Sequence, residues 1–153
     1  GSPLAEQVIA HALALGDPTR TQYTLLHVMN PLLAEHTIPP YAAGMPVADL
    51  AALRAQVQAY LNAVAARLGG QAAGVRTLLV VAEPADAILE VARAQRAGLI
   101  AMATHGRSIL ARALLGSVAE RVVHFAGVPV LLFRPDPAAQ WLPQAEAGPQ
   151  VIA

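Results

Sequence analysis

Two glycines and a serine stand where this sequence is best suited to bind a charged group. Gly106 is followed by nine residues and then by Gly116 and Ser117, and apolar runs at 99–103 and 128–133 lie on either side. Such runs are typical of buried strands. Glycine lets the backbone turn tightly and approach a ligand closely, and a serine hydroxyl can hydrogen-bond to an anion. The combination favours a phosphate-binding loop, although each glycine could also be a plain turn residue.

A helix is expected to follow this loop. Val118, Val122 and Phe125 recur at helical spacing. Ser117 and Glu120 fit a capping box, in which Ser117 is the N-cap and Glu120 is the third helical residue. The start of a helix carries unpaired N–H groups and a partial positive charge, and open α/β sheets bind ligands where a strand leads into a helix. A capping serine is compatible with an anion at the same place.

The charged residues of the loop suit binding better than catalysis. His105 could bind a ribose or a phosphate, or it could only stabilise the loop. Arg107 and Arg112 could meet phosphate charge, or they could be solvated surface arginines. Hydrolysis needs a positioned base and usually a carboxylate that holds a metal ion, and Glu120 and Glu83 do not form such a set. We therefore expect no catalytic residues and no enzymatic activity beyond slow incidental hydrolysis.

The composition excludes several classes of protein. The 153 residues suit one domain, and the formal net charge of zero gives no sign of a nucleic-acid partner. The ten basic residues are all arginine, which excludes a lysine-dependent Walker phosphate loop, and the absence of cysteine excludes disulfides and thiolate zinc sites. The five histidines lack metal-binding helical spacing, so we expect no metal site. No apolar run is long enough for a bilayer and no signal-peptide pattern opens the chain, so we expect a cytoplasmic protein without a membrane partner.

Strands and helices are expected to alternate along the chain. Such alternation indicates a parallel sheet that is covered by helices on both faces. A long irregular connection is expected at 30–46, a globular domain at 1–135 and an extended proline-rich tail at 136–153. The predicted strands cover 23–29, 75–81, 99–103 and 128–133, and the predicted helices cover 3–15, 50–68, 84–97 and 117–125, with Gly98 closing the third helix. One face of the helix at 50–68 is expected to be buried, and its residues are Leu50, Leu53, Val57, Leu61, Val64 and Leu68.

The spacing of the loop residues resembles the signature of the universal stress protein family. That signature is G-x-x-G, nine residues and G-[S/T], and it ends in an apolar strand that contains Pro-Val. The matching residues are Ala103-Thr104-His105-Gly106, then Gly116-Ser117, and later Val128-Pro129-Val130. The resemblance extends from Gly1 to about Pro135. One departure is Ala103, where the family has glycine, because a methyl group narrows the close approach of the backbone to a ligand.

The resemblance implies a fold, a ligand and a role. The fold would be an open parallel five-stranded sheet with helices on both faces, Rossmann-like and similar to the adenine nucleotide alpha hydrolases. The role would be that of a dimeric stress-response regulator that binds ATP, with or without Mg²⁺. The alternative is a member that binds no nucleotide and works as an interaction module through its dimer surface or its tail. The implied nucleotide-binding residues are Val28, Met102, Ala103, His105, Gly106, Arg107, Ser108, Gly116, Ser117 and Val118, although Val28 could also be ordinary strand core.

The last predicted strand is expected to lie at an edge of the sheet and to form a homodimer. Pro129 removes a hydrogen-bond donor, which argues for an edge, and an apolar edge strand rarely stays bare. In the family this strand pairs with its counterpart in a second subunit. The implied interface residues are Val128, Val130, Leu131, Leu132 and Phe133.

The first strand of the family is missing from this sequence. Family members begin with an apolar strand that ends in Asp-Gly-Ser, whereas here only Gly1-Ser2 remains. That strand is central in the family, and its omission would leave a gap of about 10 Å between its neighbours. Because unpaired buried backbone groups are costly, we expect a segment to fill the gap. Residues that precede this sequence are the favoured candidate, and a segment from elsewhere, such as 150–153, is the alternative.

Overall fold

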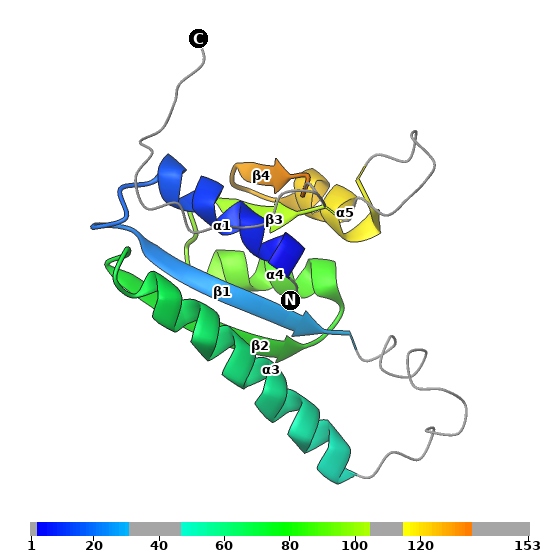
Figure 1. The fold of residues 1–153 in the computed structure, drawn as a ribbon. Coiled ribbons are helices and arrows are strands. Elements are labelled where there is room, and N and C mark those ends of the chain that lie inside the picture. Colours follow the sequence, from blue (N-terminus) through cyan, green and yellow to red (C-terminus); the bar gives the residue numbers. More distant parts are fainter. Residues whose placement is uncertain (1–2, 31–46, 105–114, 136–153) are drawn as a thin grey trace.

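The computed structural model describes residues 3–30, 47–104 and 115–135. Strands and helices alternate in them as predicted (Figure 1). Residues 31–46 of the expected irregular connection and the expected tail at 136–153 lie outside the described residues. The elements in chain order are α1 (Pro3–Leu15), β1 (Gln22–Met29), α3 (Val47–Leu68), β2 (Gly74–Val81), α4 (Pro84–Ala94), β3 (Ile100–Ala103), α5 (Ser117–Phe125) and β4 (Val130–Phe133).

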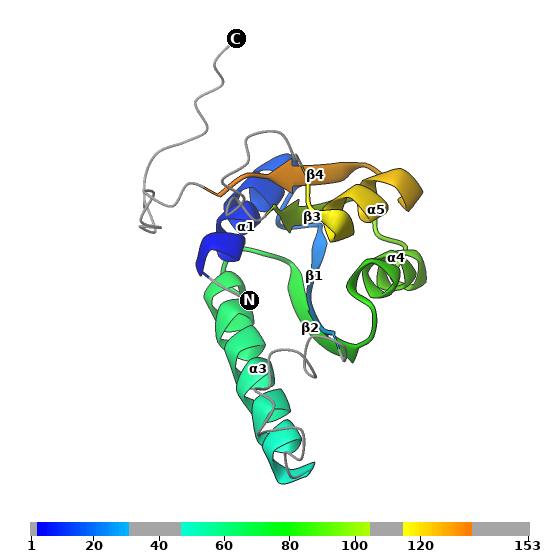
Figure 2. The same ribbon diagram turned by 90° about the vertical axis from the view of Figure 1, so that its right-hand side faces the viewer.

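The four described strands form two separate parallel pairs. β1 pairs with β2 from Gln22↔Gly74 to Met29↔Val81, and β3 pairs with β4 from Ile100↔Val130 to Ala103↔Phe133. Both views place the strands in the order β2, β1, β3, β4 (Figures 1 and 2). The predicted parallel sheet is therefore present in two parts, and the break lies between β1 and β3, where the missing strand was expected.

Helices cover both faces of the strands. Figure 2 shows α1 and α3 on one side and α4 and α5 on the other. On the first side, Gln58 of α3 donates to the hydroxyl of Thr77 in β2 over 3.1 Å, and the ring of His11 in α1 lies 4.5 Å from that of Phe133 in β4. On the second side, Ala85, Leu89, Ile100 and Val122 form the buried core that joins α4, β3 and α5.

One clasp joins α1 to α3. The hydroxyl of Tyr60 donates to the Glu6 carboxylate over 2.6 Å, and the guanidinium of Arg67 pairs with the other Glu6 oxygen. Burial, together with the hydrogen bond to Glu6 and its negative charge, raises the pKa of Tyr60 to about 12, and the positive charge of Arg67 opposes this rise. The clasp links two helices that lie far apart in the sequence.

The ends of α4 show one prediction confirmed and one wrong. Glu83 and Pro84 open the helix as expected, and the Glu83 carboxylate accepts the N–H of Asp86 over 2.9 Å. The helix ends at Ala94 and not at Gly98. Arg96 takes a left-handed φ of 49°, while the N–H groups of Arg96 and Ala97 bond back to the carbonyls of Arg93 and Ala92 over 3.1 and 2.9 Å. This is a Schellman ending with arginine in the position that glycine usually holds.

Three predictions about single residues are also corrected. Leu53 was expected on the buried face of its helix and is 40% exposed, and Phe125 at the end of α5 is 55% exposed. Both lie near a helix end, where fewer neighbouring elements cover the apolar stripe. Pro129 lies directly before β4 and not inside it, since the strand begins at Val130. Its carbonyl still accepts the N–H of Ile100 over 3.0 Å. Within the described residues β4 still pairs only with β3, so its other edge is open.

Candidate functional site

The start of α5 provides the best-defined part of the candidate site. Gly116 is the N-cap, with φ 71° and ψ 144°, and its carbonyl accepts the N–H of Glu120 over 3.0 Å. The predicted capping box is therefore wrong, because Ser117 is the first helical residue and makes no side-chain cap. The physical reason is the positive φ at residue 116, which glycine tolerates and which brings the chain into the helix one residue earlier.

This helix start is suited to an anion. The N–H groups of Ser117, Val118 and Ala119 have no carbonyl one turn earlier to bond, which is the general condition of a first helical turn. Among the residues that the structure describes, no heavy atom lies within 4 Å of the position that a Cβ would take on Gly116, and Ser117 is exposed. The space above the helix start is open in the described part of the chain, and the partial positive charge of the helix end favours phosphate there.

The predicted adenine residues lie at the carboxyl ends of two strands. Val28 is the penultimate residue of β1, and Met102 and Ala103 are the last two residues of β3. Met102 packs against the core cluster beside α4, so its side chain is mainly a core residue. Thr104 follows directly, and its N–H donates to the carbonyl of Phe133 over 2.8 Å, which fixes where the chain leaves the sheet.

The loop itself lies outside the described residues. His105, Gly106, Arg107 and Ser108 belong to this segment, so their predicted contacts with phosphate or ribose stay predictions. The structure brings Gly116, Ser117 and Val118 together at one helix start and places Val28 and Met102 on neighbouring strand pairs (Figure 1).

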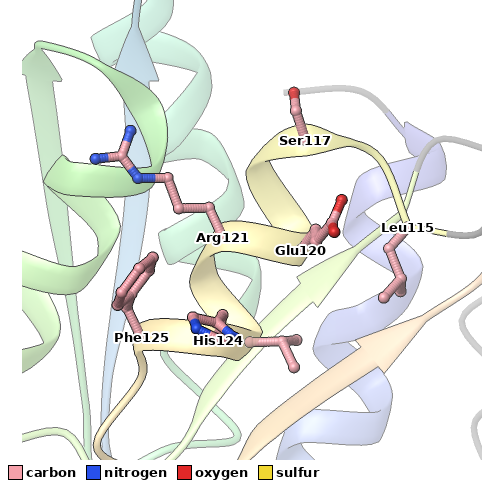
Figure 3. A pocket seen from close by; sticks show the side chains of 7 residues that line it. Leu115, Ser117, Glu120, Arg121, His124 and Phe125 are labelled. Atoms are coloured by element: carbon pink, nitrogen blue, oxygen red, sulfur yellow. The ribbon is translucent and has the colours of Figure 1, made fainter.

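An open hollow of about 520 Å³ runs along the solvent side of α5 (Figure 3). Ser117 lies at its upper end and points away from the other labelled side chains, while Phe125 and His124 lie at its lower end. Arg121 reaches across to α4, where it pairs with Asp86 at 2.7 Å and with Glu83 at 3.5 Å. These pairs occupy the guanidinium, so this hollow is a groove beside two helices and has no set of free cationic groups for a nucleotide among the described residues. Helical spacing did not predict it, because the groove depends on the exposure of Val123 and Phe125.

One titratable group of β1 has a shifted pKa. Burial lowers the pKa of His27 from its ordinary value. Within the described residues, no three His, Cys, Asp or Glu side chains are placed to hold a metal ion together. In that same part of the chain, none of the helices combines the length and apolarity that a membrane span requires.

The chain belongs to the universal stress protein family, whose family model matches residues 1–134. It is 45% identical over 60 residues to a universal stress protein of Methanocaldococcus jannaschii, a match that covers 39% of this chain and 35% of that protein. It is 44% identical over 57 residues to one from Thermus aquaticus, covering 37% of this chain and 42% of that protein. The matched part thus spans less than half the length of these relatives.

Solved structures show the same fold. The hypothetical protein MJ0577 superposes with a TM-score of 0.70 at 22% identity, over 87% of this chain and 89% of that one. A universal stress protein family member from Burkholderia pseudomallei gives a TM-score of 0.63 at 26% identity, over 87% and 89% of the two chains. A universal stress protein that was crystallised in complex with cAMP gives 0.62 at 20% identity, over 88% and 90%. The fold is therefore the Rossmann-like α/β fold of this family.

Proposed function

We propose that this universal stress protein binds ATP at the carboxyl ends of β1 and β3 and acts as a dimeric stress-response regulator. The adenine lies near Val28 and Met102, and the phosphates lie over Gly106, Gly116 and Ser117, with or without Mg²⁺. The observation that carries the proposal is the start of α5, where a glycine cap with positive φ leaves the first turn open to an anion.

Two further observations support a nucleotide. The open helix start follows a strand of a parallel α/β fold, which is the usual position of nucleotide phosphates in such folds. A structural relative was crystallised with cAMP, an adenine nucleotide. Both agree with adenine and phosphate as the chemistry of the ligand.

Regulation fits this chain better than catalysis. Among the described acidic residues beside α5, Glu83 already caps α4 and pairs with Arg121, Asp86 pairs with the same arginine, and Glu120 is exposed on the solvent side. This arrangement offers no free carboxylate positioned as a base for hydrolysis among these three residues. We propose that ATP binding changes the stability of the dimer in the cytoplasm. A protein partner would bind differently to the dimer with and without ATP.

ATP binding is tested by its effect on thermal stability. A specific ligand at a hundredfold its dissociation constant adds about 2.7 kcal/mol to the free energy of unfolding. We expect ATP to raise the melting temperature of the wild-type protein, with and without Mg²⁺. In Gly116→Val the β-branched side chain cannot adopt the positive φ without strain, so the helix start moves and the ATP-dependent shift is lost.

Gly98→Ala is the matched control. Gly98 also has open space around its Cβ position but has no positive φ, and it lies before β3. Its response to ATP should equal that of the wild type, each variant being compared with its own melting temperature without ligand. A wild-type protein that does not respond to millimolar ATP would contradict the proposal, and a full response in Gly116→Val would place the phosphates elsewhere.

The second candidate is an interaction module without nucleotide. Ala103 favours it, because the methyl group stands at the end of β3 where the family signature has glycine. Ala103→Gly distinguishes the two candidates. If the methyl group only weakens ATP binding, the glycine variant binds ATP more tightly, whereas an interaction module responds to ATP in neither form.

A further inference from the structure

Arg121 connects α5 to the start of α4. Its guanidinium lies 2.7 Å from the Asp86 carboxylate and 3.5 Å from the Glu83 carboxylate. Figure 3 shows this side chain reaching from α5 toward α4, on the opposite side of α5 from Glu120. Because Arg121 follows Ser117 by one helical turn, the two carboxylates lie close to the proposed phosphate site.

The two carboxylates stabilise the start of α4. Glu83 caps the helix by accepting the N–H of Asp86 over 2.9 Å, and Asp86 lies in the first turn. Negative charge at a helix start is favourable, because it meets the positive end of the helix dipole. The presence of both acids is therefore explained by α4 alone, without any ligand.

The start of α5 is built in the opposite way. Its cap is Gly116, which has no side chain to bond the first turn, so the N–H groups of that turn are available to an anion. The two helices contact each other along their length (Figure 2). The pair between Asp86 and Arg121 shows that the first turn of α4 lies beside the second turn of α5. One helix start thus carries negative charge while its neighbour is suited to receive it.

Without a compensating cation, the acids of α4 would repel a polyphosphate at the start of α5. Charges at a protein surface interact over about one Debye length, which is about 10 Å at 0.1 M salt. The side chains of Arg121, Glu83 and Asp86 are 47%, 43% and 58% exposed, so these ion pairs contribute little to the stability of the fold. Their main effect is on the electrostatic potential beside the phosphate site.

We propose that Arg121 is a specificity-determining residue of the ATP site. Its positive charge offsets the two carboxylates of α4 and so allows several phosphates to bind at the start of α5. Arg121 acts through Glu83 and Asp86 and does not need to contact the ligand. This inference rests on the proposed function, because it takes the phosphates to lie at that helix start, and it adds a residue that lies outside the family signature.

Calorimetric titration with ATP tests the inference. Arg121→Met removes the guanidinium and keeps a long, helix-forming side chain, so both carboxylates lose their partner. We expect the dissociation constant for ATP to rise about fivefold at low salt and by much less at high salt, because salt screens the repulsion. The rise should be smaller for AMP, which carries fewer phosphate charges. A purely structural role of Arg121 would give neither dependence.

A second substitution separates charge from geometry. Asp86→Asn in the Arg121→Met background returns the three residues to their wild-type net charge and leaves the Glu83 cap in place. We expect this double variant to bind ATP within about twofold of the wild type. Arg93→Met is the matched control, since it removes one guanidinium from the last turn of α4, and it should bind ATP as the wild type does. Circular dichroism verifies that each variant is folded.

The outcomes distinguish this inference from the proposed function. The inference is overturned if Arg121→Met binds ATP as tightly as the wild type, or if Asp86→Asn does not restore the lost affinity. In both cases the wild type still binds ATP and the proposed function stands. A wild type that does not bind ATP contradicts the proposed function itself, and the role of Arg121 is then rejected with it.

Discussion

At the scale of single residues, Arg96 holds a backbone conformation that suits glycine. Its φ of 49° closes α4, and a side chain in this left-handed region costs about 1 kcal/mol relative to glycine. We expect Arg96→Gly to raise the free energy of unfolding by about 1 kcal/mol, measured by urea denaturation at neutral pH. Arg93→Gly, in the last turn of the same helix, should lower it by about 0.5–1 kcal/mol. Equal losses in both variants would show that the Arg96 side chain makes a stabilising contact of greater value than the strain.

Residue-scale details were the least predictable from the sequence. Gly116 and Ser117 were both recognised as site residues, but the choice of cap depends on one φ angle that residue types do not determine. In the same way, the residue types allow a helix end at Gly98, but the structure ends α4 at Ala94 and places Arg96 in the left-handed conformation that follows the cap. The loop residues from His105 to Ser108 lie outside the described residues, so this part of the predicted site stays untested.

At the scale of elements, the clasp between α1 and α3 includes one hydrogen bond with a measurable pH dependence. Tyr60→Phe removes the donor to Glu6 and should lower the free energy of unfolding by about 1 kcal/mol. The folded pKa of Tyr60 is about 12, above its ordinary value of 10, so the unfolded chain loses the proton first as the pH rises. The stabilisation is therefore complete below pH 10 and is lost between pH 10 and about 12 in the wild type, and this part of the pH dependence should be absent from Tyr60→Phe.

Tyr23→Phe is the control for the same chemical change. The Tyr23 hydroxyl is buried and has no hydrogen-bond partner in the part of the chain that the structure describes. Its removal should leave the free energy of unfolding unchanged or raise it, because no bond is lost and a desolvated hydroxyl is removed. Urea denaturation of both variants at pH 8 makes the comparison, and a similar loss in both would contradict the role of the clasp.

The elements themselves were largely predictable. β1, β2, α4 and α5 follow from apolar runs and helical spacing that are local in the sequence, and the structure confirms them within a few residues. The clasp was not predictable, because it joins residues 54 positions apart that share no local pattern. The exposure of Leu53 and Phe125 was missed for the related reason that periodicity gives a helix face but not how far neighbouring elements cover it.

At the scale of the whole molecule, we propose that the outer edge of β4 forms the dimer interface. Pro129 and Phe133 direct their carbonyls to β3, so the N–H groups of Val130 and Leu132 face away from it. We expect the wild type to sediment as a dimer and Val130→Pro to sediment as a monomer, because proline removes an outward donor and no bond to β3. Val130→Ala keeps the N–H and should stay dimeric. A Val130→Pro dimer with native circular dichroism would show that the chains associate through another surface.

The global fold was predictable because the family signature and the strand–helix alternation agree, and the position of the break in the sheet followed from the missing first strand. What pairs with the facing edges of β1 and β3 could not be predicted, because no local sequence pattern identifies the partner of a strand. The structure shows which strands form the two parallel pairs and which helices pack against each pair.

The open edges of β1 and β3 also bear on how the protein behaves in concentrated solution. An uncovered apolar strand is a template on which like segments stack, and such stacking leads to turbidity and precipitation. The 153-residue chain should therefore lose solubility as its concentration rises. Light scattering of a concentrated sample measures this loss.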